Sequence, residues 1–172
     1  KRQVSQEEYD EFYKTDFHDF ADPARTISVH AEGALSYDAL LFVPSRAPWD
    51  MYSKDYKRGL ALYSSNVLIM DKCEELLPDY FGFVRGVVDS SDLTLNISRE
   101  TLQHNSQLRA IAKKIEKKIT SELKKMRDND REEYEKFFEN FGRGLEFGIY
   151  NSYGMLKDQP ADLLLFLSLI HI

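Results

Sequence analysis

The hydrophobic repeat of this chain changes from a strand period to a helical period near residue 97, and that change limits the folds that it can adopt. Residues 26–31 alternate apolar and polar side chains, and residues 35–43 return as a second strand after a glycine-containing turn. After residue 97 the apolar side chains recur instead at helical spacing. Strands therefore come first and long helices second. This order predicts an α+β fold in which helices are layered on a mostly antiparallel sheet.

Shorter elements complete this predicted order. The run Ser5-Gln6-Glu7-Glu8 has the form of a capping box and predicts a helix over residues 6–15. Residues 60–63 and 67–70 are predicted to be strand and are compatible with one strand interrupted at residues 64–66, and residues 83–88 predict another. The two long helices are predicted from two apolar stripes: Leu108, Ile111, Ala112, Ile115, Ile119, Leu123 and Met126, then Tyr134, Phe137, Phe138, Phe141 and Leu145.

Composition excludes several classes of protein. The chain has 172 residues, 42% of them hydrophobic, which is enough for one domain with a real core. Its formal net charge is −6, so the chain as a whole is not a polycation. A single cysteine, Cys73, rules out an internal disulfide and suits a reducing compartment. The longest apolar run, residues 163–170, is too short to cross a bilayer, so we expect a cytoplasmic protein without a membrane span.

Arg99 is the residue at which a ligand is most strongly indicated. It follows Ser98, a plausible N-cap, and shares a helix face with Gln103. A guanidinium beside a carboxamide at a helix N-terminus suits a phosphate or a carboxylate. The alternative is an ordinary ion pair between Arg99 and a nearby acid such as Glu100 or Asp92, and spacing alone leaves both open.

The first long helix is strongly basic. Between residues 109 and 127 it carries eight basic side chains against two acidic ones, a local excess of +6. The functional interpretation is a docking surface for an acidic partner or for nucleic acid. The structural interpretation is a solvated face whose lysine stems cover the apolar stripe, and no interleaved aromatic platform for bases is present.

Three aromatic residues in loop-like sequence, Phe20, Trp49 and Tyr52, are either exposed anchors for a partner or lids on the sheet. The four histidines lack the spacing of a metal site, and phosphate-binding glycine loops and nucleophile-elbow motifs are missing from the sequence. If the chain takes part in catalysis, we therefore expect it to complete a site supplied by another domain.

The sequence resembles the middle domain of the Hsp90 chaperone family, most closely its bacterial cytosolic members. The resemblance implies a three-layer αβα arrangement like that of the second domain of ribosomal protein S5. Residues 1–160 would be the large subdomain of the middle domain, and residues 161–172, which depart from the family pattern, a truncated or non-native apolar tail. The matching blocks are Tyr9-Asp10-Glu11-Phe12-Tyr13-Lys14, residues 41–50 with Pro44-Ser45-Arg46-Ala47-Pro48-Trp49-Asp50, residues 67–71, residues 83–90, and Leu95-Asn96-Ile97-Ser98-Arg99-Glu100 with Leu102-Gln103.

The resemblance implies part of an ATP-dependent chaperone of protein folding and the stress response. In such a protein an N-terminal domain holds ATP with magnesium, and Arg99 would contact the γ-phosphate with Gln103 beside it. The arginine acts when the domains close, which couples hydrolysis to conformation. The present chain alone is predicted to bind no cofactor and no metal and to be inactive as an ATPase.

The same resemblance implies partners. Leu68 would dock on the N-terminal ATPase domain, and Phe20 and Trp49 would contact unfolded clients or co-chaperones. The full-length protein would be a homodimer through a C-terminal domain that this chain does not contain. Membrane binding is not expected, and nucleic-acid binding is disfavoured. Two alternatives stay open: a nucleic-acid-binding domain that uses the basic helix, and a purely structural interaction domain.

Overall fold

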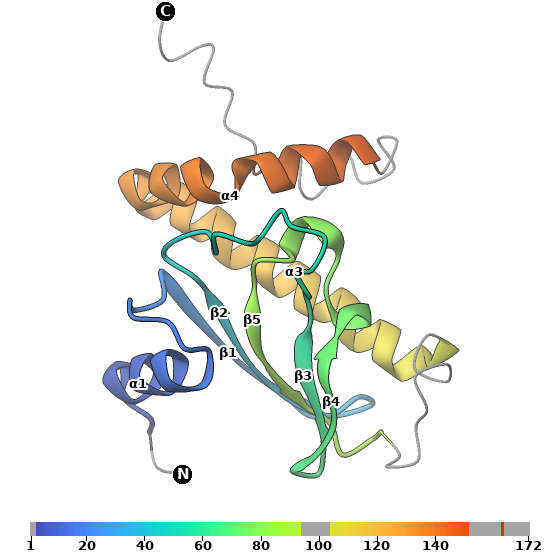
Figure 1. Ribbon diagram of the computed structural model, residues 1–172. Coiled ribbons are helices and arrows are strands. Elements are labelled where there is room, and N and C mark those ends of the chain that lie inside the picture. The colour runs from blue at the N-terminus through green and yellow to red at the C-terminus, as the bar shows by residue number, and fades with distance from the viewer. Residues whose placement is uncertain (1–2, 94–103, 152–162, 164–172) are drawn as a thin grey trace, which may run out of the picture.

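Five strands form a single sheet with helices on both of its faces, as Figure 1 shows for the computed structural model. The structure describes residues 3–93, 104–151 and 163. In chain order the elements are α1 (Gln6–Asp16), β1 (Arg25–Ala31), β2 (Tyr37–Val43), β3 (Leu60–Ser64), β4 (Val67–Cys73), the 3-10 helices η1 (Glu74–Leu76) and η2 (Asp79–Phe81), β5 (Arg85–Asp89), α3 (Ser106–Asn129) and α4 (Arg131–Asn151).

The sheet is mostly antiparallel, as the alternating sequence predicts. Its strand order is β1-β2-β5-β3-β4, and only the neighbours β3 and β5 run parallel. Residues 60–63 and 67–70 are strand as predicted, but the alternative of one interrupted strand is wrong, because they form two separate strands, β3 and β4. Ser65 and Asn66 both have positive φ, 49° and 67°, and turn the chain back so that β4 pairs antiparallel with β3. Two residues with φ above zero form the tight turn that suits a twisted hairpin, and asparagine tolerates that conformation.

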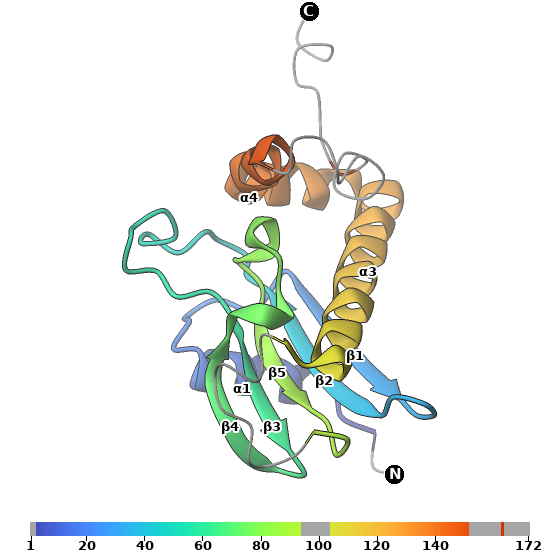
Figure 2. The same cartoon turned by 90° about the vertical axis from the view of Figure 1, so that its right-hand side faces the viewer.

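Alternating side chains of β2 point into two different cores. Phe42 packs under α1, where its ring lies 5.1 Å from the ring of Tyr13 and 6.1 Å from that of Phe12. Leu41 and Val43 point the other way, into the large core that includes the buried side chains of α3 and α4. Figure 1 and Figure 2 show α1 on one side of the sheet and α3 on the other, with α4 crossing the end of the sheet where β2 finishes and packing on α3 and η2. The fold is therefore the predicted three-layer αβα arrangement.

The two long helices begin at side-chain caps. The Asn105 side chain accepts a hydrogen bond from the Leu108 N–H at 2.9 Å, and Asp130 accepts one from the Glu133 N–H at 3.3 Å. Arg25 of β1 donates to Glu133 at 2.7 Å, so the start of α4 is also tied to the sheet. The predicted apolar stripe of α3 is buried except for Ala112, which is partly exposed, and its buried members are Leu108, Ile111, Ile115, Ile119, Leu123 and Met126.

The second half of α4 passes very close to η2. A Cβ atom at Gly148 would lie 2.3 Å from the Cβ of Tyr80, whereas one at Gly144 would find its nearest neighbour at 3.7 Å. Because it has no Cβ, Gly148 permits this close packing of α4 against η2. Glycine is a weak helix former, so its presence inside α4 is consistent with a packing role. Beyond α4, Leu163 is fully buried in the core and its carbonyl accepts a hydrogen bond from the Tyr134 hydroxyl. Leu163 therefore packs and bonds within this chain, a contact that the sequence did not indicate. The domain boundary at residue 160 stays a prediction.

Candidate functional site at one end of the sheet

The strand directions divide the sheet into two functional ends. At the turn end lie the β1–β2 turn, the β3–β4 turn and the end of β5, and at the loop end lie the start of β1 and the long β2–β3 connection. Arg99 and Gln103 fall in residues 94–103, outside the described residues. The chain enters that segment from the turn end, because β5 finishes there at Asp89 and the described chain continues to Leu93.

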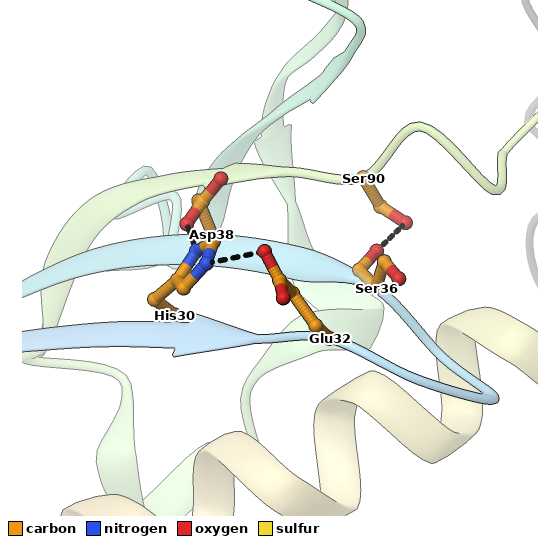
Figure 3. Close-up of polar contacts among 5 residues, drawn as sticks. All are labelled: His30, Glu32, Ser36, Asp38 and Ser90. Atoms are coloured by element: carbon orange, nitrogen blue, oxygen red, sulfur yellow. Dashed lines mark hydrogen bonds and ion pairs between the residues drawn. The ribbon is translucent and has the colours of Figure 1, made fainter.

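Hydrogen bonds to Ser36 hold the chain after β5 on its β2 side. The N–H of Ser36 donates to a carboxylate oxygen of Asp92 at 2.7 Å. The hydroxyl of Ser90 donates to the carbonyl of Ser36 at 2.8 Å, as Figure 3 shows. Both backbone polar groups of one residue in the β1–β2 turn are therefore used by the segment that leads to Arg99. Ser36 and Asp92 are 56 positions apart, so no local sequence pattern could have indicated this contact.

Further hydrogen bonds hold the same chain on its β3 side. The hydroxyl of Ser64 donates to the carbonyl of Leu93 at 2.6 Å, and the N–H of Ser90 donates to the carbonyl of Tyr63 at 3.1 Å. Ser64 and Ser90 are both buried, so these bonds are shielded from competing water. The entry to the Arg99 segment is thus attached to strands on both sides of β5.

The β1–β2 hairpin carries a second polar cluster close to Ser36. The His30 ring lies between two carboxylates, with Nδ1 2.5 Å from Asp38 and Nε2 2.9 Å from Glu32 (Figure 3). All three side chains are exposed, so each pair is expected to contribute little to stability. The His30–Asp38 pair links β1 to β2 in the register that presents the Ser36 backbone to Asp92, whereas Glu32 contacts His30 of the preceding strand.

Leu68 lies at the turn end as well. Tyr63 of β3 pairs with Leu68 of β4 on one side and with Asp89 of β5 on the other. Asp89 also accepts a hydrogen bond from the Asn66 N–H at 2.8 Å, which ties the β3–β4 turn to β5. Leu68 and its neighbour Val67 are both about half exposed, at 51% and 52%. The structure therefore places an exposed apolar pair at the end of the sheet from which the chain continues toward Arg99, with β3 between the pair and β5.

Phe20 and Trp49 lie at the opposite, loop end, and both are almost completely exposed. Asp19 shapes the Phe20 loop by accepting hydrogen bonds from the Tyr13 hydroxyl at 2.6 Å and the Ala21 N–H at 3.1 Å. Partial burial opposes ionisation of Asp19, but these hydrogen bonds outweigh it and lower the pKa of its carboxyl. The lid interpretation is therefore wrong for Phe20 and Trp49, and also for Tyr52, which is 65% exposed.

The outward face of α3 keeps its basic character in the folded domain. Lys113, Lys114 and Lys117 are exposed. Glu122 forms ion pairs with Lys118 at 3.1 Å and with Lys125 at 3.0 Å, so part of the positive charge is compensated within the helix. The arrangement is compatible with both interpretations of this helix, a solvated face and a docking surface for an acidic partner.

Cys73 illustrates how burial controls reactivity. Its thiol is fully buried, and burial together with the nearby Glu75 carboxylate raises its pKa from 9.0 to about 12. Because a raised pKa keeps the thiol protonated, iodoacetamide at pH 8 should leave Cys73 unmodified in the native protein and alkylate it rapidly in urea. Mass spectrometry of both samples measures this, and rapid native labelling would contradict the buried position.

Within residues 3–93 and 104–151, His, Cys, Asp and Glu side chains do not gather in groups of three that could hold a metal ion. In the same part of the chain, none of the helices is long and apolar enough to span a membrane.

Comparison with known proteins identifies the family. The family model described as Hsp90 protein matches residues 1–171. The chain is 54% identical to the chaperone protein HtpG of Bacillus subtilis and 52% identical to that of Alkaliphilus metalliredigens, in each case over 98% of this chain and 27% of the relative. It therefore spans about a quarter of the length of these relatives.

A solved structure supports the same conclusion for the fold. The middle domain of a heat shock protein from Plasmodium falciparum superimposes with a TM-score of 0.79 at 27% identity, covering 94% of this chain and 62% of that one. The observed order of strands and helices is thus that of an Hsp90 middle domain. Together with the family match over residues 1–171, this places the chain in the Hsp90 chaperone family.

Proposed function

We propose that this chain is the middle segment of an ATP-dependent chaperone and that Arg99 contacts the γ-phosphate of ATP held by a separate N-terminal domain. The observation that carries the proposal is the composition of the turn end. There, Ser36 of the β1–β2 turn and Ser64 of β3 hold the entry to the Arg99 segment from both sides of β5, and the half-exposed Leu68 lies at the same end of the sheet, on β4 beyond β3. An apolar docking residue at the end of the sheet from which the chain continues toward Arg99 supports a site that is completed by another domain.

In this proposal the chain contributes one charged group to a site completed by another domain. ATP, when bound with magnesium in the N-terminal domain, supplies the transferring phosphoryl group. The guanidinium of Arg99, with the carboxamide of Gln103 beside it, would stabilise negative charge that develops on that group. Leu68 would hold the two domains together by burying apolar surface. The chain alone is therefore proposed to lack ATPase activity.

The test of this proposal is ATP turnover by the full-length protein carrying Arg99→Ala, with ATP binding measured on the same variant. A fall in turnover with preserved binding supports the proposed role. Turnover equal to that of the unaltered protein removes Arg99 from the mechanism.

Client binding is the second part of the proposed function, and we assign it to the loop end. Phe20 and Trp49 expose large apolar surfaces there without any cover from the described residues. Large aromatic side chains are enriched among the residues that anchor protein–protein interfaces. We propose that this surface receives unfolded client segments or co-chaperones.

Replacing Phe20 and Trp49 together with alanine should lower the affinity for an unfolded client by about tenfold, because each ring buries its area only in the complex. The melting temperature should stay unchanged, since both side chains are exposed. Fluorescence anisotropy with a labelled, permanently unfolded protein measures the affinity. Tyr150→Ala is the matched control, because it removes an aromatic side chain of 80% exposure from α4. An equal loss in both variants would contradict the assignment.

The basic face of α3 supports one alternative, a docking surface for a nucleic acid or for an acidic co-chaperone. Three exposed lysines on one helix, Lys113, Lys114 and Lys117, would give binding that weakens steeply with salt. A gel-shift experiment at low salt that finds no complex with nucleic acid would remove that version. We also propose dimerisation through a C-terminal domain outside this chain, and a cytoplasmic location that suits the free thiol of Cys73.

A further inference from the structure

We propose that Asp92 and Ser90 are positioning residues for Arg99, because by binding the backbone of Ser36 they set the point from which the Arg99 segment leaves the sheet. The inference rests on the proposed function of Arg99. It adds to that function a named set of side chains that would determine how well the arginine is placed.

The first argument is that the contact is specific and double. Asp92 accepts from the Ser36 N–H at 2.7 Å, and Ser90 donates to the Ser36 carbonyl at 2.8 Å. A bond between a carboxylate and a backbone N–H is charge-assisted and stronger than a neutral one. Both hydrogen bonds end on Ser36 of the β1–β2 turn, so residues 90–92 cannot pivot about one of them without breaking the other.

The second argument is that the opposite side is held as firmly. Ser64, which is 2% exposed, donates to the carbonyl of Leu93 at 2.6 Å. The N–H of Ser90 donates to the backbone carbonyl of Tyr63. Leu93 stands six positions before Arg99 in the sequence, so the point at which the chain is held at Leu93 limits the region that the guanidinium can reach. A displacement of about 1 Å at a reacting group is enough to lower a rate by about a hundredfold.

The third argument separates positioning from stability. Asp92 itself is exposed and lies outside the hydrophobic core. Its loss should therefore leave the fold intact, while freeing the turn from the chain that leads to Arg99. Glu32, in the same turn region, is also an exposed carboxylate but contacts the His30 ring instead of the Ser36 backbone. Glu32→Ala is therefore a matched control for Asp92→Ala.

The experiment compares ATP turnover of the full-length protein carrying Asp92→Ala, Asp92→Asn, Ser90→Ala or Glu32→Ala. We expect Asp92→Ala to lower kcat by about tenfold with KM for ATP unchanged, and Ser90→Ala to act in the same direction. Asp92→Asn should retain most of the turnover, because its carboxamide oxygen still accepts the Ser36 N–H. Glu32→Ala should behave like the unaltered protein, and melting temperatures should confirm that Asp92→Ala is folded.

A double variant tests whether Asp92 acts through Arg99. If it does, Asp92→Ala should have no further effect on kcat in a protein that already carries Arg99→Ala. An equal loss in both backgrounds would overturn the inference, as would normal turnover of Asp92→Ala while Arg99→Ala is slow. Normal turnover of Arg99→Ala would instead remove the proposed function, so the two failures are distinguishable.

Discussion

The Arg99→Ala variant of the full-length protein is expected to hydrolyse ATP at least about a hundredfold more slowly than the unaltered protein, with little change in ATP affinity. Arginines that reach a transferring phosphoryl group contribute roughly a thousandfold or more to turnover, because they stabilise charge that develops only in the transition state. Affinity should change little, because the adenine, the sugar and magnesium would be bound by the N-terminal domain. Steady-state hydrolysis and equilibrium binding of a labelled nucleotide measure the two quantities separately.

Arg99→Lys sharpens this experiment. Lysine keeps the positive charge but lacks the planar fork of donors that a guanidinium offers to phosphate oxygens. We therefore expect its turnover to lie between those of the alanine variant and the unaltered protein. If Arg99→Lys were fully active, charge alone would suffice. If Arg99→Ala were fully active, the ion-pair interpretation of Arg99 would be the correct one.

The largest effect on stability is expected for Gly86→Ala. Gly86 lies in β5, between β2 and β3 at the centre of the sheet, with φ +153°. A Cβ at this position would lie 2.2 Å from the carbonyl oxygen of Leu40 and 2.9 Å from the Cα of Leu41. Both are backbone atoms that cannot move without disturbing the β2–β5 pairing. We expect the free energy of unfolding to fall by about 3 kcal/mol or more, as measured by urea denaturation.

Gly33→Ala provides the matched control for this prediction. Gly33 also has a positive φ, +131°, but no atom lies within 4 Å of a Cβ built there. Its variant should therefore show only the cost of the unfavourable backbone conformation, about 1 kcal/mol. The difference between the two variants isolates the steric contribution of the crowded sheet centre. Equal losses would mean that backbone conformation alone determines the effect.

The hydrophobic pattern was sufficient to predict most of the layers of this fold. The buried stripe of α3 and the β1–β2 hairpin follow directly from their periodicity, because periodicity reports which side of an element faces a core. The pairing of β3 with β4 did not follow. A polar interruption in an apolar stretch is equally compatible with a bulge and with a reversal, and the positive φ values of Ser65 and Asn66 distinguish the two.

The candidate site also combines residues that the sequence indicated with contacts that only the structure revealed. Arg99 and Gln103 were singled out from their spacing at a predicted helix start, and Leu68 from the resemblance of the chain to the Hsp90 family; their roles stay predictions. The contacts of Ser36 with Ser90 and Asp92 were not foreseen, because serine and aspartate in turn-like sequence usually bond to their own neighbours. Likewise, the exposure of Phe20 and Trp49 depends on what the rest of the chain leaves uncovered.

The sequence by itself determined the order of elements, which of their faces are apolar and which family the chain resembles, because these depend on spacing along the chain. Only the tertiary structure decided which end of the sheet Leu68, Phe20 and Trp49 occupy. Strand direction and register place Leu68 at the same end of the sheet as the end of β5, and place Ser36 where Asp92 can bind it. Such proximity arises when all five strands pair in one sheet, and hydrogen bonds between residues 56 positions apart have no signature in local sequence.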